Sequence, residues 1–147
     1  MYDNLSQIIG IIFYEVNLMM KKTNKPLGTL SAVELELMEA IWASPTPITV
    51  AALVHMFEDS RGWKTSTVST MLERMIAKGF LEKTAQGKTN HYTPIATLKE
   101  YQAQEGQEIL STLYNGSIVN FVAALVDDGN INQKDIQELS DWFKTIE

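Results

Sequence analysis

The sequence predicts a mainly α-helical fold with one small β element, arranged in two domains. Apolar residues recur at helical spacing in several segments, and two short runs that flank a glycine-containing loop at residues 85–88 predict a β-hairpin. Beyond Pro94 the pattern is purely helical. We expect an N-terminal extension at residues 1–28, a first domain at 29–95 and a helical domain at 96–147.

An amphipathic helix is expected at the centre of the chain. Its apolar stripe, with the 3.6-residue period of a helix, consists of Val68, Met71, Leu72, Met75 and Ile76. Thr65 is the predicted N-cap and Gly79 the residue after the C-cap, so the helix should run from about Ser66 to Lys78. Short hydroxyl side chains cover the other face near its N-terminus. There they can approach phosphates and base edges, beside the positive end of the helix dipole.

A hairpin is expected directly after this helix. Residues 80–84 and 89–93 are its predicted strands, and the four residues between them form a loop of hairpin length. Lys83 and Lys88 are expected near the tip, where a wing would touch the phosphate backbone. A helix that runs into a basic hairpin is the layout of a winged helix-turn-helix, which binds DNA. The alternative is a solvated amphipathic helix followed by an ordinary hairpin.

The distribution of charge favours the DNA-binding interpretation. The chain has a net charge of −6, which by itself argues weakly against nucleic acid. Residues 61–96, however, contain six Lys or Arg against two Glu, whereas residues 30–60 and 97–147 are both acidic. A molecule of this kind can present one basic face to DNA, while its acidic remainder limits non-specific binding.

A capped helix is expected at the start of the first domain. Ser31 and Glu34 form a capping box, and the helix should end near Ala43, before the prolines of residues 44–47. Its apolar stripe consists of Val33, Leu37, Met38, Ile41 and Trp42. The glutamates expected to be ordinary solvated charges on its outer face are Glu34, Glu36 and Glu39.

A short strand and a second helix are expected next. Ile48 and Thr49 can pair as a strand against the wing, and Thr49 can cap the second helix. The apolar residues of that helix are Ala51, Leu53, Val54, Met56 and Phe57. Residues 59–62 then form the turn that leads to the central helix. The order helix, strand, helix, turn, helix, hairpin is that of a winged helix domain.

Three helices are expected in the tail. The first begins at a capping box of Thr97 and Glu100 and continues to about Tyr114. Ser117 caps the second, which is apolar nearly all round, and Asn132 opens the third. A tail of this size is marginal as a core on its own, so dimerisation is the natural way to cover its apolar surface. The expected dimer contacts are Leu110, Leu113, Ile118, Phe121, Val122, Leu125, Ile136, Leu139, Trp142 and Phe143.

The N-terminal segment at residues 5–20 is apolar, but it does not have the pattern of a signal peptide. It contains Glu15 and lacks both a basic start and a small-residue cleavage site. Nor does any run reach the roughly 18 apolar residues that cross a bilayer. The codons of Glu15 and the following valine can form a ribosome-binding purine tract, so we hypothesise that translation starts at Met19 or Met20. If the segment is translated, we expect an extra helix that binds a partner.

Four segments carry a resemblance to a known family. They read LSAVELELMEAIW at residues 30–42, ITVAALVHMF at 48–57, WKTSTVSTMLERMIAKGFLEK at 63–83 and INQKDIQEL at 131–139. Together they resemble the penicillinase repressor family, from about Leu30 to the end of the chain. The resemblance implies a homodimeric transcriptional repressor with a winged helix-turn-helix domain and a C-terminal three-helix dimerisation domain. Members of the family block transcription at a palindromic operator until a signal releases them.

The resemblance also implies roles for individual residues. In the recognition helix, the DNA-binding roles fall on Lys64, Thr65, Ser66, Thr67, Ser69, Thr70 and Arg74. In the wing, where the family pattern is looser, they fall on Lys83 and Lys88.

Two departures from the family pattern concern the releasing signal. Copper-responsive members end in a cysteine-rich metal motif, and this chain has no cysteine, which excludes thiolate metal sites and disulfides. Members controlled by a sensor protease are cut at an Asn-Phe bond, and Asn120-Phe121 is present here. Alignment on INQKDIQEL places the family's cut four residues later, at Ala124-Leu125, so we interpret the dipeptide as a coincidence. A sensor protease is still a partner that the resemblance allows.

No catalytic, cofactor or metal site is expected. His55 and His91 have no cysteine or obvious carboxylate partner, and no catalytic triad spacing or phosphate-binding loop occurs. We therefore predict a cytoplasmic homodimeric repressor that binds double-stranded operator DNA, has no enzymatic activity and does not bind a membrane. The alternative from another class is a winged helix that binds a protein partner through its acidic first and last helices instead of DNA.

Overall fold

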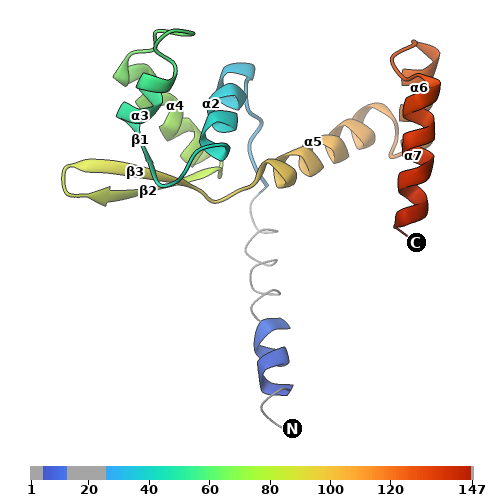
Figure 1. The fold of residues 1–147 in the computed structure, drawn as a ribbon, viewed down its shortest axis with the longest axis horizontal. Helices are drawn as coiled ribbons and strands as arrows, with labels where there is room; N and C mark the ends of the chain where they lie inside the picture. Colours follow the sequence, from blue (N-terminus) through green and yellow to red (C-terminus); the bar gives the residue numbers. More distant parts are fainter. Residues whose placement is uncertain (1–4, 13–25, 147) are drawn as a thin grey trace. The chain divides into compact units, whose positions relative to one another are not determined.

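The computed structural model describes residues 5–12 and 26–146, and the fold is mainly helical with one small sheet (Figure 1). From residue 26 onward the elements are α2 (Ala32–Trp42), β1 (Ile48–Thr49), α3 (Val50–Met56), α4 (Thr65–Ala77), β2 (Leu81–Gln86), β3 (Thr89–Pro94), α5 (Leu98–Leu113), α6 (Ile118–Asp127) and α7 (Gln133–Thr145). This order confirms the predicted mainly α fold with a β wing.

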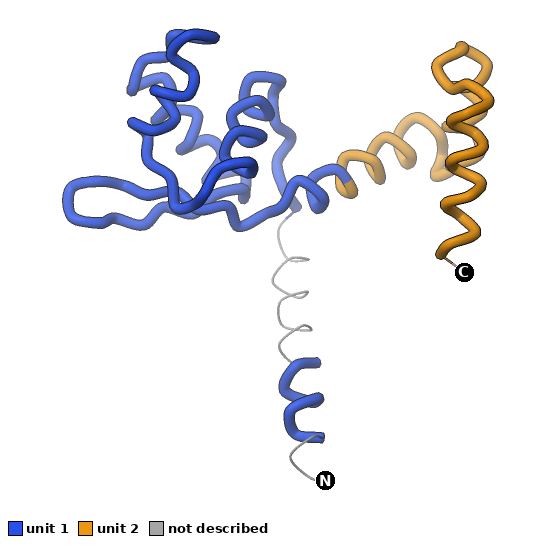
Figure 2. Tube along the Cα trace, in the orientation of Figure 1, with its two compact units in different colours: residues 1–102 blue, residues 103–147 orange. Residues whose placement is uncertain are grey.

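Two compact units make up the chain, residues 1–102 and residues 103–147 (Figure 2). The division falls within α5, and the domain boundary expected after residue 95 stays a prediction. Residues 5–12 form a short exposed helix. The proposed translation starts at Met19 and Met20 lie outside the described residues.

One face each of α2, α3 and α4 builds the core of the first unit. The side chains with no exposed surface are Leu37, Met38, Ile41, Leu53, Val68, Leu72, Met75 and Phe80. Most of the predicted stripes are thereby confirmed, but the prediction for Val33 is wrong, because this side chain is exposed and its neighbour Glu34 is buried instead. Ala51 and Met56 of α3 are also exposed. Phe80 joins α2 to α5, because its ring meets the rings of Trp42 and Tyr101 edge-on.

The sheet has the strand order β1-β3-β2, and both strand pairs are antiparallel. Ile48 pairs with Tyr92 and Thr49 with His91, which confirms that the short first strand adds to the wing. The strands β2 and β3 are longer than predicted and leave only Gly87 and Lys88 in the turn. Gly87 has a φ of 64°, and a two-residue hairpin turn requires such a conformation at its first position.

The ends of α4 differ in how well the sequence predicts them. Lys64, not Thr65, is the N-cap, so Thr65 is the first residue of the helix. At the other end, Gly79 has the expected left-handed conformation, with a φ of 92°. The amide of Phe80 donates to the carbonyl of Met75, and that of Gly79 to Ile76, which is the hydrogen-bond pattern of a Schellman motif. This turn leads the chain from α4 directly into β2.

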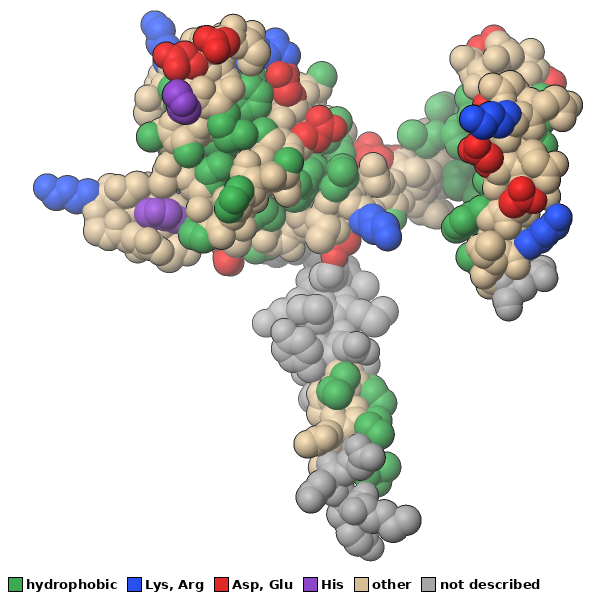
Figure 3. All heavy atoms as spheres, viewed as in Figure 1, with side chains coloured by type: hydrophobic (Ala, Val, Ile, Leu, Met, Phe, Trp, Pro, Cys, Tyr) green, Lys and Arg blue, Asp and Glu red, His purple; other side chains and the backbone are tan. Residues whose placement is uncertain are grey.

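The second unit contains well-capped helices but no buried side chains in α6 or α7. The amide of Asn120 donates to Ser117 at the start of α6, and Asn132 and Asp135 form a capping box at the start of α7. These contacts confirm the predicted helix starts. In Figure 3 Lys, Arg, Asp and Glu side chains are scattered over the visible face of the second unit, and hydrophobic side chains show along one edge of it.

No single helix in the described ranges is long and apolar enough to cross a membrane. The pair α5 and α6 passes that test only when taken together, by length and composition, and is bent by 83° at the break.

A buried ion pair joins α2 to the end of α4. Glu34 is only 5% exposed, and its Oε1 accepts hydrogen bonds from Lys78 Nζ at 2.8 Å and from the amide of Ser31 at 3.0 Å. Lys78 Nζ also donates to the carbonyl of Thr29. The expectation that Glu34 is an ordinary solvated charge is therefore wrong. The capping box turns this side chain back toward its own N-terminus, where Lys78 meets it.

The surroundings of Glu34 shift the pKa of its carboxyl group. Burial alone would raise this pKa, but the hydrogen bonds from Lys78 and Ser31 outweigh burial and leave the pKa below its usual value. Because the pKa is lower in the folded than in the unfolded chain, the contribution to stability is present above the unfolded pKa. It is lost as the pH falls through the folded pKa.

The Lys78→Met substitution is expected to destabilise the first unit by about 3 kcal/mol at neutral pH, because it leaves a buried carboxylate without its cation. Urea unfolding of the full chain at fixed protein concentration measures this change. The difference from wild type should shrink near pH 4, since Glu34 can then take up a proton. Adding Glu34→Gln should restore part of the loss. An equal difference at both pH values would contradict this account of the pair.

Candidate nucleic-acid interface

The exposed face of α4 carries most of the predicted DNA-binding residues. Its buried face faces the core, so Ser66, Thr67, Thr70 and Arg74 lie together on the solvent side. With Met71 at their edge they line a shallow hollow of about 330 Å³. Ser69 does not join them, because it is partly buried and is not among the residues that line the hollow. The structure therefore brings four of the candidates into one surface.

The hydroxyl of Thr70 already has a partner for its proton. Its Oγ1 donates to the carbonyl of Ser66 at 2.8 Å, one turn earlier in the helix. Toward a ligand, the side chain consequently offers a lone pair and a methyl group. Such a pair of groups suits an amino group or a methyl group on a base edge better than a base acceptor.

The N-terminus of α4 faces solvent with no side-chain cap. Lys64 makes no capping hydrogen bond, and Lys64, Thr65 and Ser66 are all exposed. Backbone amides in the first turn of a helix have no partner within the helix, and they favour anions. The cation of Lys64 and the unpaired amides of the helix start therefore lie next to each other.

The turn before α4 is held by aromatic and ionic contacts. The rings of Phe57 and Trp63 lie 4.7 Å apart, and the guanidinium of Arg61 lies over Trp63. Arg61 also forms a two-pronged ion pair with Glu36 of α2. This contact lowers the pKa of Glu36 and raises that of Arg61. Arg61 therefore positions the start of α4 and is already paired.

Ion pairs engage three of the six cations in residues 61–96. Arg61 pairs with Glu36, Lys78 with Glu34, and Lys83 with Glu73. The other three of these six cations, Lys64, Arg74 and Lys88, have no ion pair with a described residue. The segment therefore has fewer unpaired cations in the fold than a count along the sequence suggests. Sequence reasoning missed Glu36 and Glu73 as partners, because each meets its cation from another element.

The wing places its two lysines differently. Lys88 lies in the turn and is exposed, as predicted. Lys83 lies opposite Tyr92, three residues before β2 ends, so the prediction that it lies near the tip is wrong. Its Nζ donates to Glu73 Oε1 at 2.8 Å, and this hydrogen bond raises the pKa of Lys83.

The histidines are not grouped with other metal ligands. Over residues 5–12 and 26–146, no three His, Cys, Asp or Glu side chains come together in a way that could hold a metal ion. His55 lies on the surface of α3, with its Nδ1 3.4 Å from Glu58. His91 lies on β3 between Thr49 and Thr84, and its Nδ1 is buried without a hydrogen-bond partner.

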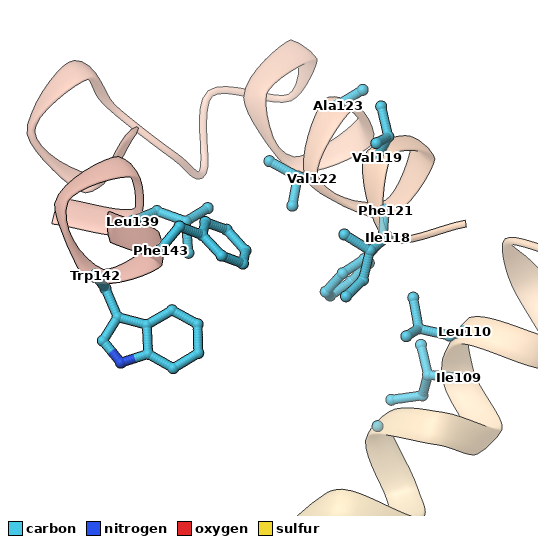
Figure 4. A pocket seen from close by; sticks show the side chains of 11 residues that line it. Ile109, Leu110, Ile118, Val119, Phe121, Val122, Ala123, Leu139, Trp142 and Phe143 are labelled. Atoms are coloured by element: carbon cyan, nitrogen blue, oxygen red, sulfur yellow. The ribbon is translucent and has the colours of Figure 1, made fainter. Parts of the chain in front are cut away.

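An apolar cavity of about 640 Å³ lies within the second unit (Figure 4). Side chains of α6 and α7, including Phe121, Val122, Leu139 and Phe143, point into it. Seven of the predicted dimer contacts line it: Leu110, Ile118, Phe121, Val122, Leu139, Trp142 and Phe143. The remaining three, Leu113, Leu125 and Ile136, are not among its lining residues. Trp142 is 55% exposed and Phe143 46%, so a single chain leaves this apolar surface in water.

Phe121 also packs within the second unit. Its ring meets that of Tyr114 edge-on, with centroids 5.1 Å apart. Both Asn120-Phe121 and Ala124-Leu125 lie inside α6.

Comparison with known proteins identifies the family. A family model described as penicillinase repressor matches residues 30–145. The chain belongs to this family. Its members are transcriptional repressors, which are not enzymes. The resemblance seen in the sequence is thereby confirmed.

Individual relatives cover most of this penicillinase repressor family member. The penicillinase repressor of Bacillus licheniformis is 28% identical over 115 residues, which are 78% of this chain and 89% of that protein. The methicillin resistance regulatory protein MecI of Mammaliicoccus sciuri is 22% identical over 75% of this chain and 89% of that protein. A solution structure of the DNA-binding domain of the repressor BlaI is 31% identical, covers 52% of this chain and 93% of that one, and has a TM-score of 0.47.

Proposed function

We propose that this chain is a sequence-specific transcriptional repressor that binds a palindromic operator as a homodimer and leaves it in response to a signal. The observation that carries the proposal is the exposed face of α4. It presents hydroxyl side chains and Arg74 together, next to Lys64 and an open helix end. Membership of the penicillinase repressor family supports the same function.

In the proposed complex, α4 enters the major groove and the wing follows the backbone. Arg74 can donate two hydrogen bonds to one guanine, the commonest specific contact that arginine makes. Ser66, Thr67 and Thr70 are short enough to let the helix approach the base edges. Lys64 at the start of α4 and Lys88 in the turn of the wing meet phosphates in this complex, so they add affinity without sequence preference.

The second unit supports a dimer because it lacks a core of its own. No side chain of α6 or α7 is buried in a single chain, and the cavity between them is almost wholly apolar. An exposed apolar surface of this kind is typical of a protein interface. A second copy of the same unit can fill the cavity symmetrically, and a two-fold dimer then places two copies of α4 on two half-sites.

Selection of bound sequences from a random duplex library tests the DNA-binding proposal. We expect a two-fold symmetric consensus whose half-sites lie about one helical turn, or a multiple of it, apart. Absence of duplex binding at low salt would overturn the proposal and favour a module that binds proteins.

Protein variants, measured on the selected duplex, test the exposed face of α4. Arg74→Ala should weaken binding by about 10- to 100-fold, as expected for a lost bidentate base contact, and should relax the preference at one position of each half-site. Lys64→Ala should weaken binding to all duplexes and reduce the salt dependence, with a change of about 0.9 per protomer in the slope of log K against log salt. Lys99→Ala is the matched control, because it removes an exposed cation of α5, outside α4 and the wing. If Arg74→Ala behaved like this control, α4 would be wrongly assigned.

Analytical ultracentrifugation tests the dimer. Phe143→Glu should convert dimers to monomers, because it places a charge in the apolar cavity. Affinity for a duplex with two half-sites should then fall by about 10²- to 10⁴-fold, since binding of one protomer no longer brings the second protomer to its half-site. Ser140→Glu adds the same charge to an exposed position of α7 outside the cavity and should stay dimeric. A monomeric wild-type protein would refute the dimer.

A further inference from the structure

An acidic side chain lies on the exposed side of the proposed recognition helix. Glu73 precedes Arg74 in α4, and its side chain is 54% exposed. A carboxylate at such a place repels the phosphates of DNA, so it lowers affinity unless another contact compensates for its charge. Its described ionic partner is Lys83 of β2, with Oε1 and Nζ 2.8 Å apart.

This contact joins the reading helix to the wing. Lys83 lies opposite Tyr92 in the hairpin, and Tyr92 is buried at the base of the wing. Burial raises the pKa of Tyr92, and the charge of Glu73 raises it further while that of Lys83 lowers it. The charges of Glu73 and Lys83 therefore both act on the Tyr92 hydroxyl.

We propose that Glu73 is a specificity-determining residue, which neutralises Lys83 and thereby restricts the phosphate contacts of the wing. This inference rests on the proposed DNA-binding function. Each cation that neutralises a phosphate adds affinity for any sequence, because it releases a condensed counterion. A lysine that is already paired with a carboxylate adds little of this affinity. The wing then binds phosphate mainly through Lys88, and the base contacts of α4 decide where the protein binds.

The pair has a second effect on how the wing is placed. It holds the side chain of Lys83 against α4, so this cation follows the backbone of an arbitrary duplex less readily. Both partners are partly exposed, and the pair adds little to folding stability for that reason. Its consequence is expected in DNA binding and in the response of binding to salt.

Glu73→Gln tests the proposal, because glutamine has the same shape without the charge. On a random-sequence duplex at about 0.1 M salt, affinity should rise by about five- to tenfold per protomer, and the slope of log K against log salt should steepen by about 0.9. Affinity for the selected operator should rise less, because the base contacts of α4 hold the wing in one position there, whereas on a random-sequence duplex the released Lys83 can follow the backbone. The ratio of specific to non-specific binding should therefore fall. Fluorescence anisotropy with both labelled duplexes measures all three quantities.

Two further variants separate the pair from a simple loss of negative charge. Glu82→Gln removes a carboxylate from an exposed neighbour of Lys83 for which the structure shows no ion pair, and it is the matched control. In a Lys83→Gln background, Glu73→Gln should raise affinity only as much as this control does. If Glu73→Gln equals Glu82→Gln in the native background, or has the same effect with and without Lys83, the proposed restriction is wrong.

These outcomes also distinguish the two proposals. A wild-type protein that selects an operator but is insensitive to Glu73→Gln overturns only the role of Glu73. A wild-type protein that binds neither duplex overturns the proposed function itself.

Discussion

The carboxylate of Glu34 is the contact on which the position of the proposed recognition helix depends. One of its oxygens accepts from the cap of its own helix and from Lys78 at the end of α4. Lys78 in turn is bound through its side chain to Thr29 and through its carbonyl to Gly28. A Cβ on Gly28 would lie 2.7 Å from Lys78, so the chain can pass there only because this residue has no side chain. The end of α4, the start of α2 and the residues just before α2 are therefore joined by hydrogen bonds.

The caps and stripes of this fold could be predicted because they are local. A capping box such as that of Ser31 involves only four consecutive residues, and the Schellman turn needs only Gly79 after an amphipathic stretch. The family resemblance also depends on local segments. The one-residue error at the start of α4, Thr65 for Lys64, arose because the prediction relied on a capping side chain, and this helix begins without one.

The three ion pairs of the basic segment could not be predicted, because each joins residues on different parts of the fold. Glu73 and Lys83 meet only once the register of the hairpin and its angle to α4 are known, and Glu34 meets Lys78 across 44 positions. Counting charges along the sequence identified residues 61–96 as the basic segment. It could not show that half of the cations in that segment already have partners. For a protein that binds DNA, this difference decides how affinity is divided between phosphates and bases.

The second unit connects folding, association and release in the proposed repressor. Because α6 and α7 bury no side chain in a single chain, a partner in the proposed dimer would supply most of the apolar burial that stabilises them. Association and the ordering of this unit would then be one equilibrium, which shifts with protein concentration. In the proposed complex the operator is bound tightly only while two copies of α4 act together. A signal that disturbs α6 or α7 can therefore release DNA without touching any residue of the reading surface.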